Sequence, residues 1–445
     1  MNLYRGTLVG IWAALLLLVG LTFSLAEEPQ PAAPLSPLGS GYTEAAVRGE
    51  DAGCAAPCQR PAAPSGSEVL LLEYSLPVSP TNLLMGAGGD IWFTSFWSEP
   101  GDVENSGIGR LDRSTGTVIL YPLEGRGNVW DLAQDPGGNV WYTTANGGHV
   151  GKLDPSKGEF VDWAFAEHHY GLELEPATGD VWLVTAGEGA GIYRLTPATN
   201  RVEGWLSLPY TATYDLAMDS LGHLWFTVQP NARQGVGRLV PDRKLYTIWT
   251  MPTPRARPMR LHVASTDEIW LTQFAAASNS IARLRPSTGG LDEFRMPTSN
   301  AGPLSLVEAQ DRIWFTQWRA SGVGRLNPRQ ATPVTTFLQP ARIRASRVVS
   351  TIVPTTFAVV PIEKVAQVAE REAVRTVTGG FVEFALPAAG SEPFGIAFDL
   401  NRGDVWFAEY ATARIGRILG GDADIYAFFL PVLLKGHGGS SSAGR

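Results

Sequence analysis

Apolar and polar residues alternate in short runs over most of residues 68–420, and Gly, Asp, Asn or Pro separates one run from the next. Alternation with a period of two, bounded by turn residues, predicts β-strands. One strand of each repeat carries a tryptophan, as in residues 403–409 (GDVWFAE), and a partner strand containing Gly-Arg or a close variant follows, as in residues 415–418 (IGRI). The repeated tryptophans are Trp92, Trp141, Trp182, Trp225, Trp270, Trp314 and Trp406.

The spacing of these tryptophans defines the repeat. Successive separations are 49, 41, 43, 45, 44 and 92 residues. Each unit predicts four strands, and four strands at this spacing are typical of a propeller blade. A single blade cannot bury both of its faces, so the blades must stack in a ring. We therefore predict an all-β, seven-bladed β-propeller of four-stranded antiparallel blades over residues 68–420, with the tryptophans packed between blades.

The two ends of the repeat region indicate how the ring closes. Residues 68–77 (EVLLLEYSLP) have the pattern of an outer strand, but no inner strands precede them. The last repeat supplies three strands and lacks a fourth. We expect the N-terminal strand to complete the last blade, with residues 425–430 of the tail as the alternative.

The long final step contains an insertion over residues 330–380, in the sixth blade between its Gly-Arg strand and its outer strand. Within it, residues 362–377 (IEKVAQVAEREAVRTV) predict a helix with Val365, Val368 and Ala369 on one face. Two interpretations are open: an excursion at the edge of the ring without a role, or an arm that docks a protein partner.

The chain outside the repeats has a different composition. Arg5, an apolar stretch over residues 8–21 and the small residues around Ala26 predict a signal peptide over residues 1–26 and therefore a secreted protein; an uncleaved membrane anchor is the alternative. Residues 27–67 are rich in Pro, Ala, Gly and Ser, which predicts a disordered linker. Cys54 and Cys58 lie in this linker, and export favours a small disulfide loop between them. Residues 421–445 form a C-terminal tail, whose end we expect to be disordered.

Charge and composition limit the classes of partner. The 445 residues are 44% apolar and 18% charged, which suits a large buried core. The net charge is -8 and the isoelectric point is about 5.4, which argues against nucleic acid as a main partner. Sequence motifs for a phosphate-binding loop, a zinc metalloprotease and a nucleophile elbow are absent from the chain. We expect a monomer.

A ligand site is expected at one mouth of the central channel, where the loops that enter the inner strands and leave the tryptophan strands meet. Aligned on the tryptophans, these positions are mostly aromatic, which suits a small cyclic or aromatic ligand. The predicted ligand-binding residues are Trp130, Tyr170, Tyr214, Phe274, Trp318, Phe394 and Tyr410.

Few ionisable residues lie near this mouth. Glu392 and Glu409 belong to neighbouring strand ends of the last blade, so their carboxylates could share a divalent metal ion or a proton; solvated loop acids are the alternative. His168 and His169 precede Tyr170, and either is a candidate general base, with an ordinary surface histidine as the alternative.

Residues 393–418 and 301–328, together with outer strands that end in Leu-Pro, resemble the streptogramin B lyase (virginiamycin B lyase) family. The resemblance implies a seven-bladed propeller that linearises a cyclic depsipeptide by elimination, using Mg²⁺, carboxylates and histidines at one channel mouth. The family's last blade reads Glu-Pro-His-Gly and then Trp-Phe-Ala-x-Glu. Here the corresponding residues are Glu392, Phe394 and Glu409, so both acids match and the histidine is replaced.

The other Pro-His position of the family is also changed, because this chain has Leu304 after Pro303, and the similar segment before it has Met259 after Pro258. Phe, Leu and Met cannot abstract a proton. Two functions follow from the resemblance and its departures. One is an exported carbon-oxygen lyase that acts on a cyclic peptide or lactone with Mg²⁺, and the other is a non-catalytic extracellular propeller that binds a ligand or a protein.

Overall fold

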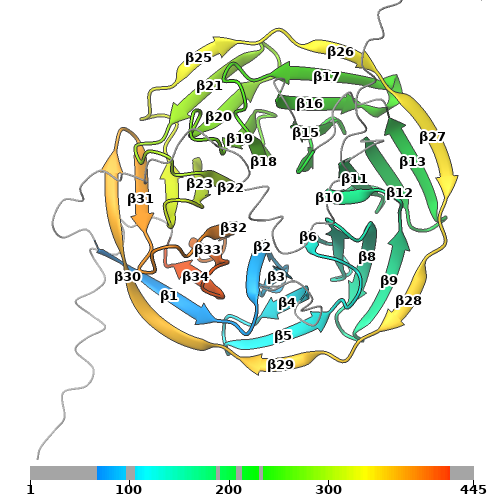
Figure 1. The fold of residues 1–445 in the computed structure, drawn as a ribbon, viewed down its shortest axis with the longest axis horizontal. Helices are drawn as coiled ribbons and strands as arrows, with labels where there is room; N and C mark the ends of the chain where they lie inside the picture. Colours follow the sequence, from blue (N-terminus) through cyan, green and yellow to red (C-terminus); the bar gives the residue numbers. More distant parts are fainter. Residues whose placement is uncertain (1–67, 97–105, 187–190, 207–212, 230–233, 421–445) are drawn as a thin grey trace, which may run out of the picture. The chain divides into compact units, whose positions relative to one another are not determined.

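The computed structural model describes residues 68–96, 106–186, 191–206, 213–229 and 234–420, and these residues form a β-propeller (Figure 1). The one helical element that they include is a short 3-10 turn, η2 (Pro241–Arg243). The chain divides into two units, residues 1–39 and 40–445. The predicted signal peptide, the linker with Cys54 and Cys58, and the tail lie outside the described residues. No helix of the described part is long and apolar enough to cross a membrane.

Six antiparallel sheets surround the centre, and five of them are built from four consecutive strands plus one strand of the insertion. The first holds β2 (Ser79–Met85), β3 (Ile91–Phe96), β4 (Gly107–Leu111) and β5 (Thr117–Pro122). The second holds β6 (Val129–Gln134), β7 (Val140–Thr144), β8 (His149–Asp154) and β9 (Glu159–Ala164). The third holds β10 (His168–Leu174), β11 (Val181–Ala186), β12 (Ile192–Thr196) and β13 (Arg201–Leu206).

The fourth sheet holds β14 (Leu216–Met218), β15 (Leu224–Val228), β16 (Gly235–Val240) and β17 (Leu245–Thr250). The fifth holds β18 (Pro258–Val263), β19 (Ile269–Gln273), β20 (Ser280–Arg285) and β21 (Gly290–Arg295). The sixth has nine strands. In spatial order these are β22 (Pro303–Ala309), β23 (Arg312–Gln317), β24 (Gly322–Leu326), β31 (Phe381–Ala385), β30 (Gln367–Thr378), β1 (Glu68–Ser75), β34 (Arg414–Ile418), β33 (Asp404–Glu409) and β32 (Pro393–Asp399).

The N-terminal strand closes the ring, as predicted. β1 pairs antiparallel with β34, with Tyr74 opposite Ile415. The alternative strand, residues 425–430, lies outside the described residues. Because β1 and β34 come from opposite ends of the repeat region, this pairing fastens the last sheet to the start of the propeller.

The insertion is a belt around the outside of the propeller, defined here as strands β25 to β30 (Figure 1). Its first five strands are β25 (Val334–Phe337), β26 (Ala341–Arg344), β27 (Ser346–Thr351), β28 (Thr355–Ala358) and β29 (Ile362–Val365). They pair in turn with the outer strands β21, β17, β13, β9 and β5. β30 then pairs with both β1 and β31. The belt ends where it began, because the amide of Asn327 donates to the carbonyl of Gly380 at 2.8 Å.

The helix predicted over residues 362–377 is therefore wrong, since β29 and most of β30 occupy this segment. Its apolar residues fall equally on the two faces of an extended strand, so the sequence of the segment shows no period of two. The outer strand of each sheet offers unpaired backbone groups, which favour the addition of another strand. Pairing with these distant edges decides the conformation, and local sequence does not encode it.

The repeated residues pack in the same way from sheet to sheet. Each repeated tryptophan is buried, and five of them share an apolar core cluster with the next repeat; Trp225, for example, shares one with Leu261 and Ile269. The cation of each Gly-Arg strand lies over the tryptophan ring of its own sheet, at 5.0 Å for Arg417 and Trp406. Across the seven repeats this distance runs from 5.0 to 5.8 Å. The cross-strand pairing of each cation with tryptophan gives these cations a structural role.

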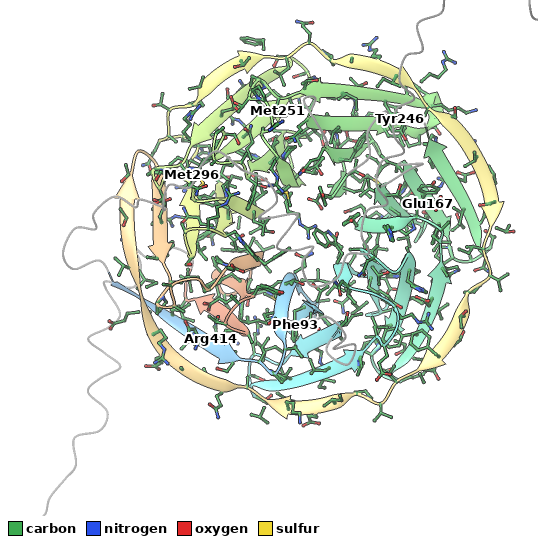
Figure 2. The ribbon with its side chains drawn as sticks, viewed as in Figure 1. Phe93, Glu167, Tyr246, Met251, Met296 and Arg414 are labelled. Carbon is green, nitrogen blue, oxygen red and sulfur yellow. The ribbon has the colours of Figure 1, made fainter. Side chains whose placement is uncertain are left out.

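In five of the seven repeats a glycine precedes the cation and makes room for an aromatic ring. A Cβ at Gly109 would overlap the ring of Phe93, which fills the interior beside it (Figure 2). Gly416 stands in the same relation to Phe407. The Gly-Arg motif is therefore a packing motif, in which one residue admits a ring and the next covers the tryptophan.

Candidate functional site at the channel mouth

The inner strands β2, β6, β10, β14, β18, β22 and β32 contact one another around the centre. Six of them carry a bulge close to their first residues, where the pairing register with the second strand shifts. A bulge bends a strand and turns a side chain away from the regular alternation. The residues at these bulges are the positions that the repeat alignment assigned to the mouth: Asn82, Trp130, Tyr170, Met259, Leu304 and Phe394.

Six of the seven predicted aromatic residues meet in one group, which we call the aromatic cluster. Trp130 lies at its centre, with ring centroids 5.1 Å from Tyr170, 6.1 Å from Tyr214 and 6.1 Å from Phe394. Trp318 extends the group, because its ring lies 5.5 Å from Phe394 and 5.9 Å from the ring of Tyr410. These residues come from distant parts of the chain, so only the closed ring brings them together.

Most of the aromatic cluster is packed against itself. Trp130, Tyr170, Phe394 and Trp318 are buried, whereas Tyr214 and Tyr410 are half-buried. The seventh predicted residue, Phe274, is also buried but does not join these ring contacts; it lies under the guanidinium groups of Arg257 and Arg319, at 5.4 and 4.1 Å. The surface available to a flat ligand is therefore the tyrosine side of the cluster.

Threonines two residues after the tryptophan hold the bulges in place, and the sequence alignment did not identify them. The hydroxyl of Thr316 accepts a hydrogen bond from the amide of Ser305 at 3.1 Å and donates to the carbonyl of Phe394 on the neighbouring inner strand at 2.7 Å. Thr272 donates in the same way to the carbonyl of Leu304 at 2.9 Å. One hydroxyl thus links two inner strands, using both its donor and its acceptor capacity.

Arg260 crosses the channel beside the aromatic cluster and was not predicted. Its Nη1 lies 3.0 Å from Asp215 Oδ1 and 3.6 Å from Asp131 Oδ2, and its guanidinium lies 5.8 Å from the Trp130 ring centroid. Burial raises the pKa of both aspartates, and the Arg260 charge offsets part of this rise. Asn82 donates a further hydrogen bond to Asp131. Together, Asn82, Asp131, Asp215 and Arg260 link four inner-strand segments across the axis.

The two glutamates predicted as metal ligands lie on adjacent strands. Pro393 of β32 is opposite Glu409 of β33, and the amide of Tyr410 donates to the carbonyl of Glu392 at 3.3 Å. Glu392 has a φ of 52°, in the left-handed region. A non-glycine residue in this region costs about 1–3 kcal/mol, and the corresponding position before β22 is Gly302. Glycine at position 392 would relieve this strain, and the chain has a glutamate there instead.

Glu409 is fully buried and its carboxyl group is poorly compensated. Burial raises the pKa of Glu409 to about 7, and the Glu73 carboxylate also raises it. The charge of Arg414 (Figure 2) lowers this pKa and so opposes both effects. The hydroxyls of Ser391 and Thr412 lie near enough to lower this pKa slightly. Neither Glu409 oxygen has a partner that satisfies hydrogen-bond geometry among the described residues.

The other repeats show what Glu409 replaces. Gln273 occupies the equivalent position in the fifth sheet and donates to Glu293 Oε1 at 2.9 Å, and Gln317 donates in the same way to Glu383. In the last repeat the outer-strand acid is Glu73, and the residue that faces it, Glu409, is also an acid. The chain therefore places two carboxyl groups where its other repeats pair an amide with a carboxylate.

The two candidate histidines lie in different environments. His168 is exposed at the start of β10. His169 is fully buried, with ring centroids 4.4 Å from Phe165 and 6.2 Å from Tyr193. Burial lowers the pKa of His169 to about 3, and neither ring nitrogen has a hydrogen-bond partner in the described part of the chain. His169 is thus a neutral residue of the interior and is not open to a ligand at the mouth.

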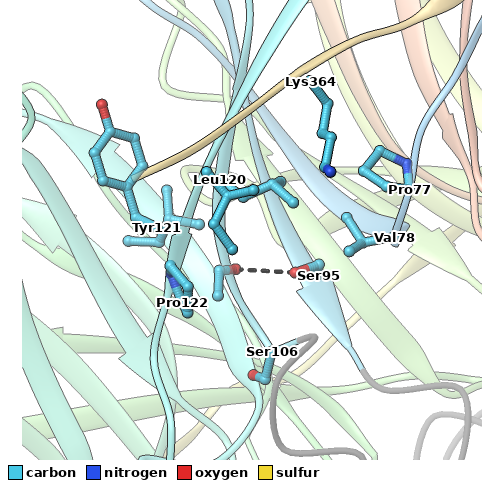
Figure 3. A pocket seen from close by; sticks show the side chains of 11 residues that line it. Pro77, Val78, Ser95, Ser106, Leu120, Tyr121, Pro122 and Lys364 are labelled. Carbon is cyan, nitrogen blue, oxygen red and sulfur yellow. Dashed lines mark hydrogen bonds between the residues drawn. The ribbon is translucent and has the colours of Figure 1, made fainter. Parts of the chain in front are cut away.

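Two cavities lie away from the aromatic cluster. One of about 210 Å³ lies between β4, β5 and the belt strand β29, where Ser95, Tyr121 and Lys364 face it (Figure 3). The other, of about 460 Å³, lies between the fourth and fifth sheets. Over the ranges that the structure describes, no group of three or more His, Cys, Asp or Glu side chains is arranged to hold a metal ion.

The fold and the mouth define a class of protein: a β-propeller whose inner strands bring aromatic and acidic residues to one end of the channel. The chain belongs to the Virginiamycin B lyase family, whose model matches residues 73–342, more than half of the chain. A curated relative, virginiamycin B lyase of Nocardia farcinica (strain IFM 10152), is 27% identical over 236 residues, which are 52% of this chain and 75% of the relative.

Solved structures of the same family share the fold. Virginiamycin B lyase from Staphylococcus aureus superimposes with a TM-score of 0.58 and 22% identity, over 78% of this chain and 98% of that one. A catalytically inactive histidine-to-alanine variant of the S. aureus enzyme, crystallised with quinupristin, matches equally well, with a TM-score of 0.58 and the same coverage.

Proposed function

We propose that this protein is an exported, ligand-binding β-propeller that takes a small cyclic or aromatic ligand at its channel mouth and does not carry out the elimination of its lyase relatives. The observation that carries the proposal is Phe394. It stands where the family motif has a histidine, and it is buried between Trp130 and Trp318. A phenyl ring cannot accept a proton, so the group that would start an elimination is missing there.

The other positions support the same conclusion. Leu304 and Met259 are buried and apolar. His169 is enclosed by aromatic rings, and His168 is exposed at the start of β10. Aromatic surfaces with a few polar groups suit binding of a flat organic ligand, and Tyr214 and Tyr410 offer partly accessible rings.

A metal-assisted lyase is the second candidate, and Glu409 favours it. Its two oxygens are buried without hydrogen-bond partners among the described residues, and the backbone of Glu392, in a strained conformation, accepts a hydrogen bond from Tyr410, the residue after Glu409. Mg²⁺ commonly keeps most of its waters and takes one or two carboxylates, so this pair meets the minimum for such an ion. When bound there, Mg²⁺ would polarise a carbonyl of the ligand. The residues of the chain that would hold it are Glu392 and Glu409.

We further propose that the propeller has seven blades. The nine-stranded sheet would then count as two blades, β22-β23-β24-β31 and β32-β33-β34-β1, which the belt strand β30 joins through its pairing with β31 and β1. The apolar start of the chain supports export, with cleavage near Ala26.

The test incubates the purified protein with Mg²⁺ and quinupristin, the compound named with the S. aureus variant. We expect calorimetry to detect binding and mass spectrometry to detect no linearised product. A Phe394→Ala variant, which removes a ring of the cluster and whose folding is verified by thermal unfolding, should bind more weakly. Linearised product from the wild-type protein would establish the lyase instead. Absence of binding in both proteins would reject the mouth as a site for this class of ligand.

A further inference from the structure

The larger cavity, of about 460 Å³, opens between the fourth and fifth sheets at the strand ends opposite the mouth. Its wall includes the turn between β14 and β15, the turn between β18 and β19, and the turn after β20. In a blade of antiparallel strands these turns lie at the end opposite the loops that lead into the inner strands. The cavity is therefore separate from the aromatic cluster.

One side chain in its wall departs from the repeat. In four sheets the cation of the Gly-Arg strand pairs with an acid two residues before the tryptophan. These pairs are Arg110 with Asp90 (3.5 Å), Arg194 with Asp180 (3.6 Å), Arg283 with Glu268 (3.5 Å) and Arg417 with Asp404 (2.9 Å). In the fourth sheet the cation is Arg238, and the residue two before Trp225 is His223. Arg238 thus lacks the acidic partner that four of its six equivalents have.

No other carboxylate replaces that partner. Arg238 has no ion pair within the described ranges, and its Nε is buried without a hydrogen-bond partner. Its guanidinium lies between two indole rings, 5.4 Å from Trp225 and 5.6 Å from Trp249. Burial lowers the pKa of Arg238; Asp219 opposes this, and the charges of Arg342 and Arg243 add to it. An additional negative charge would be stabilised here.

The nearest acid, Asp219, is already occupied. Its Oδ1 accepts from the amides of Leu221 (3.0 Å) and His223 (2.9 Å). Its Oδ2 accepts from Trp225 Nε1 (2.9 Å) and lies 3.0 Å from His223 Nδ1. These four contacts use its acceptor capacity, and Asp219 forms no ion pair with Arg238 within the described ranges.

The remaining charged residues of the wall are also paired. Asp267 accepts from the amide and the hydroxyl of Ser220, at 3.1 and 2.8 Å. Glu268 pairs with Arg283. Arg285 donates to both oxygens of Asp292, at 2.6 and 2.8 Å. Arg238 is therefore the cation of the wall that lacks an acidic partner in the described part of the chain.

We propose that this cavity binds the carboxylate of a small organic monoanion through the guanidinium of Arg238. A planar guanidinium fits a carboxylate with two parallel hydrogen bonds. Three carboxylates line the wall, so a dianion such as phosphate would be repelled more strongly than a monoanion. The exposed side chain of Leu221, with Pro286 in the same wall, would contact the apolar body of the ligand.

The test titrates benzoate and, separately, inorganic phosphate into the full-length protein by calorimetry. Arg238→Gln removes the cation and should weaken benzoate binding at least about tenfold, the cost of one charge-assisted hydrogen bond. His223→Asp restores the acid of the other repeats, so that Arg238 is satisfied internally and benzoate binding is lost. Glu175 and Asp180 occupy these two positions together in the third sheet, which indicates that the blade accommodates both acids.

Arg329→Gln is the matched control, because it removes an exposed arginine on a different sheet and should leave benzoate binding unchanged. Thermal unfolding of each variant verifies that it is folded. Absence of benzoate binding in the wild-type protein, or benzoate binding in Arg238→Gln and His223→Asp as tight as in the wild-type protein, would overturn the proposal. Phosphate binding more tightly than benzoate would overturn the monoanion assignment. Because the mouth is not involved, none of these outcomes depends on the quinupristin experiment.

Discussion

Replacing Glu409 with Gln should stabilise the propeller at alkaline pH. The substitution gives the last repeat the residue that the fifth and sixth repeats already have, where Gln273 and Gln317 donate to the outer-strand acid. In this chain the corresponding acceptor, Glu73 Oε1, is buried and has no hydrogen-bond partner among the described residues. A glutamine amide at position 409 would face it without adding a charge.

The magnitude follows from the pKa of Glu409, about 7 in the folded chain against an ordinary value of 4.5. Between these two pH values the unfolded chain releases the proton while the folded chain retains it, so the stability of the wild-type protein falls as the pH rises. Above pH 7 the loss is complete and amounts to about 3 kcal/mol. The Glu409→Gln variant has a neutral side chain at this position, so its stability does not fall in this way as the pH rises.

Urea unfolding of the two proteins at pH 4 and pH 9, in the presence of a chelator, measures the effect. We expect similar free energies of unfolding at pH 4, and a variant more stable by about 3 kcal/mol at pH 9. Equal stability at pH 9, or a less stable variant, would refute the reasoning. Repeating the pH 9 experiment with Mg²⁺ separates the second candidate function, because an ion held by Glu409 would stabilise the wild-type protein and not the variant.

Two further predictions concern the histidine and the belt. His169→Phe should make the protein more resistant to acid. The wild-type chain is fully stabilised above pH 6.5 and loses up to about 5 kcal/mol of stability as the pH falls toward the folded-state pKa of His169, about 3. Unfolding curves of the two proteins should therefore agree at pH 7 and diverge at pH 4, with the variant more stable. Removing residues 332–379, whose ends meet at Ala331 and Gly380, should leave a propeller that unfolds at least about tenfold faster, because seven outer strands lose a partner. Unchanged unfolding kinetics would show that the belt does not restrain the ring.

The repeat itself could be predicted from the sequence. Trp406, Gly416 and Arg417 recur in equivalent form because their interactions are local: the tryptophan, the glycine and the cation lie on paired strands of one hairpin. Short strands with a period of two and turn residues between them leave little choice of secondary structure. Ring closure by the N-terminal strand was predictable for a similar reason, because the last repeat was short by one strand.

The belt could not be predicted, and the helix expected within it was wrong. The side chains of β29 are exposed, so no buried face selects a period, and β30 is held by backbone pairing with β1 and β31. β31 follows β30 directly along the chain, but β1 and β5, the partner of β29, lie far away in the sequence. The conformation of residues 362–377 is therefore set by sheet edges that exist only once the ring has formed.

The sequence predicted which aromatic residues lie at the mouth, but it did not predict which residues contact one another there. The alignment placed Trp130, Tyr170 and Phe394 at one end of the channel, and their rings do meet there. It did not identify Arg260, because the aspartates that bind it come from other repeats. Likewise, Phe274 is a mouth residue by alignment, yet its ring packs under two arginines. Sequence determined which residue types recur at each position, through local strand pairing. Only the closed ring decided which of them touch, because those contacts join strands that are distant along the chain.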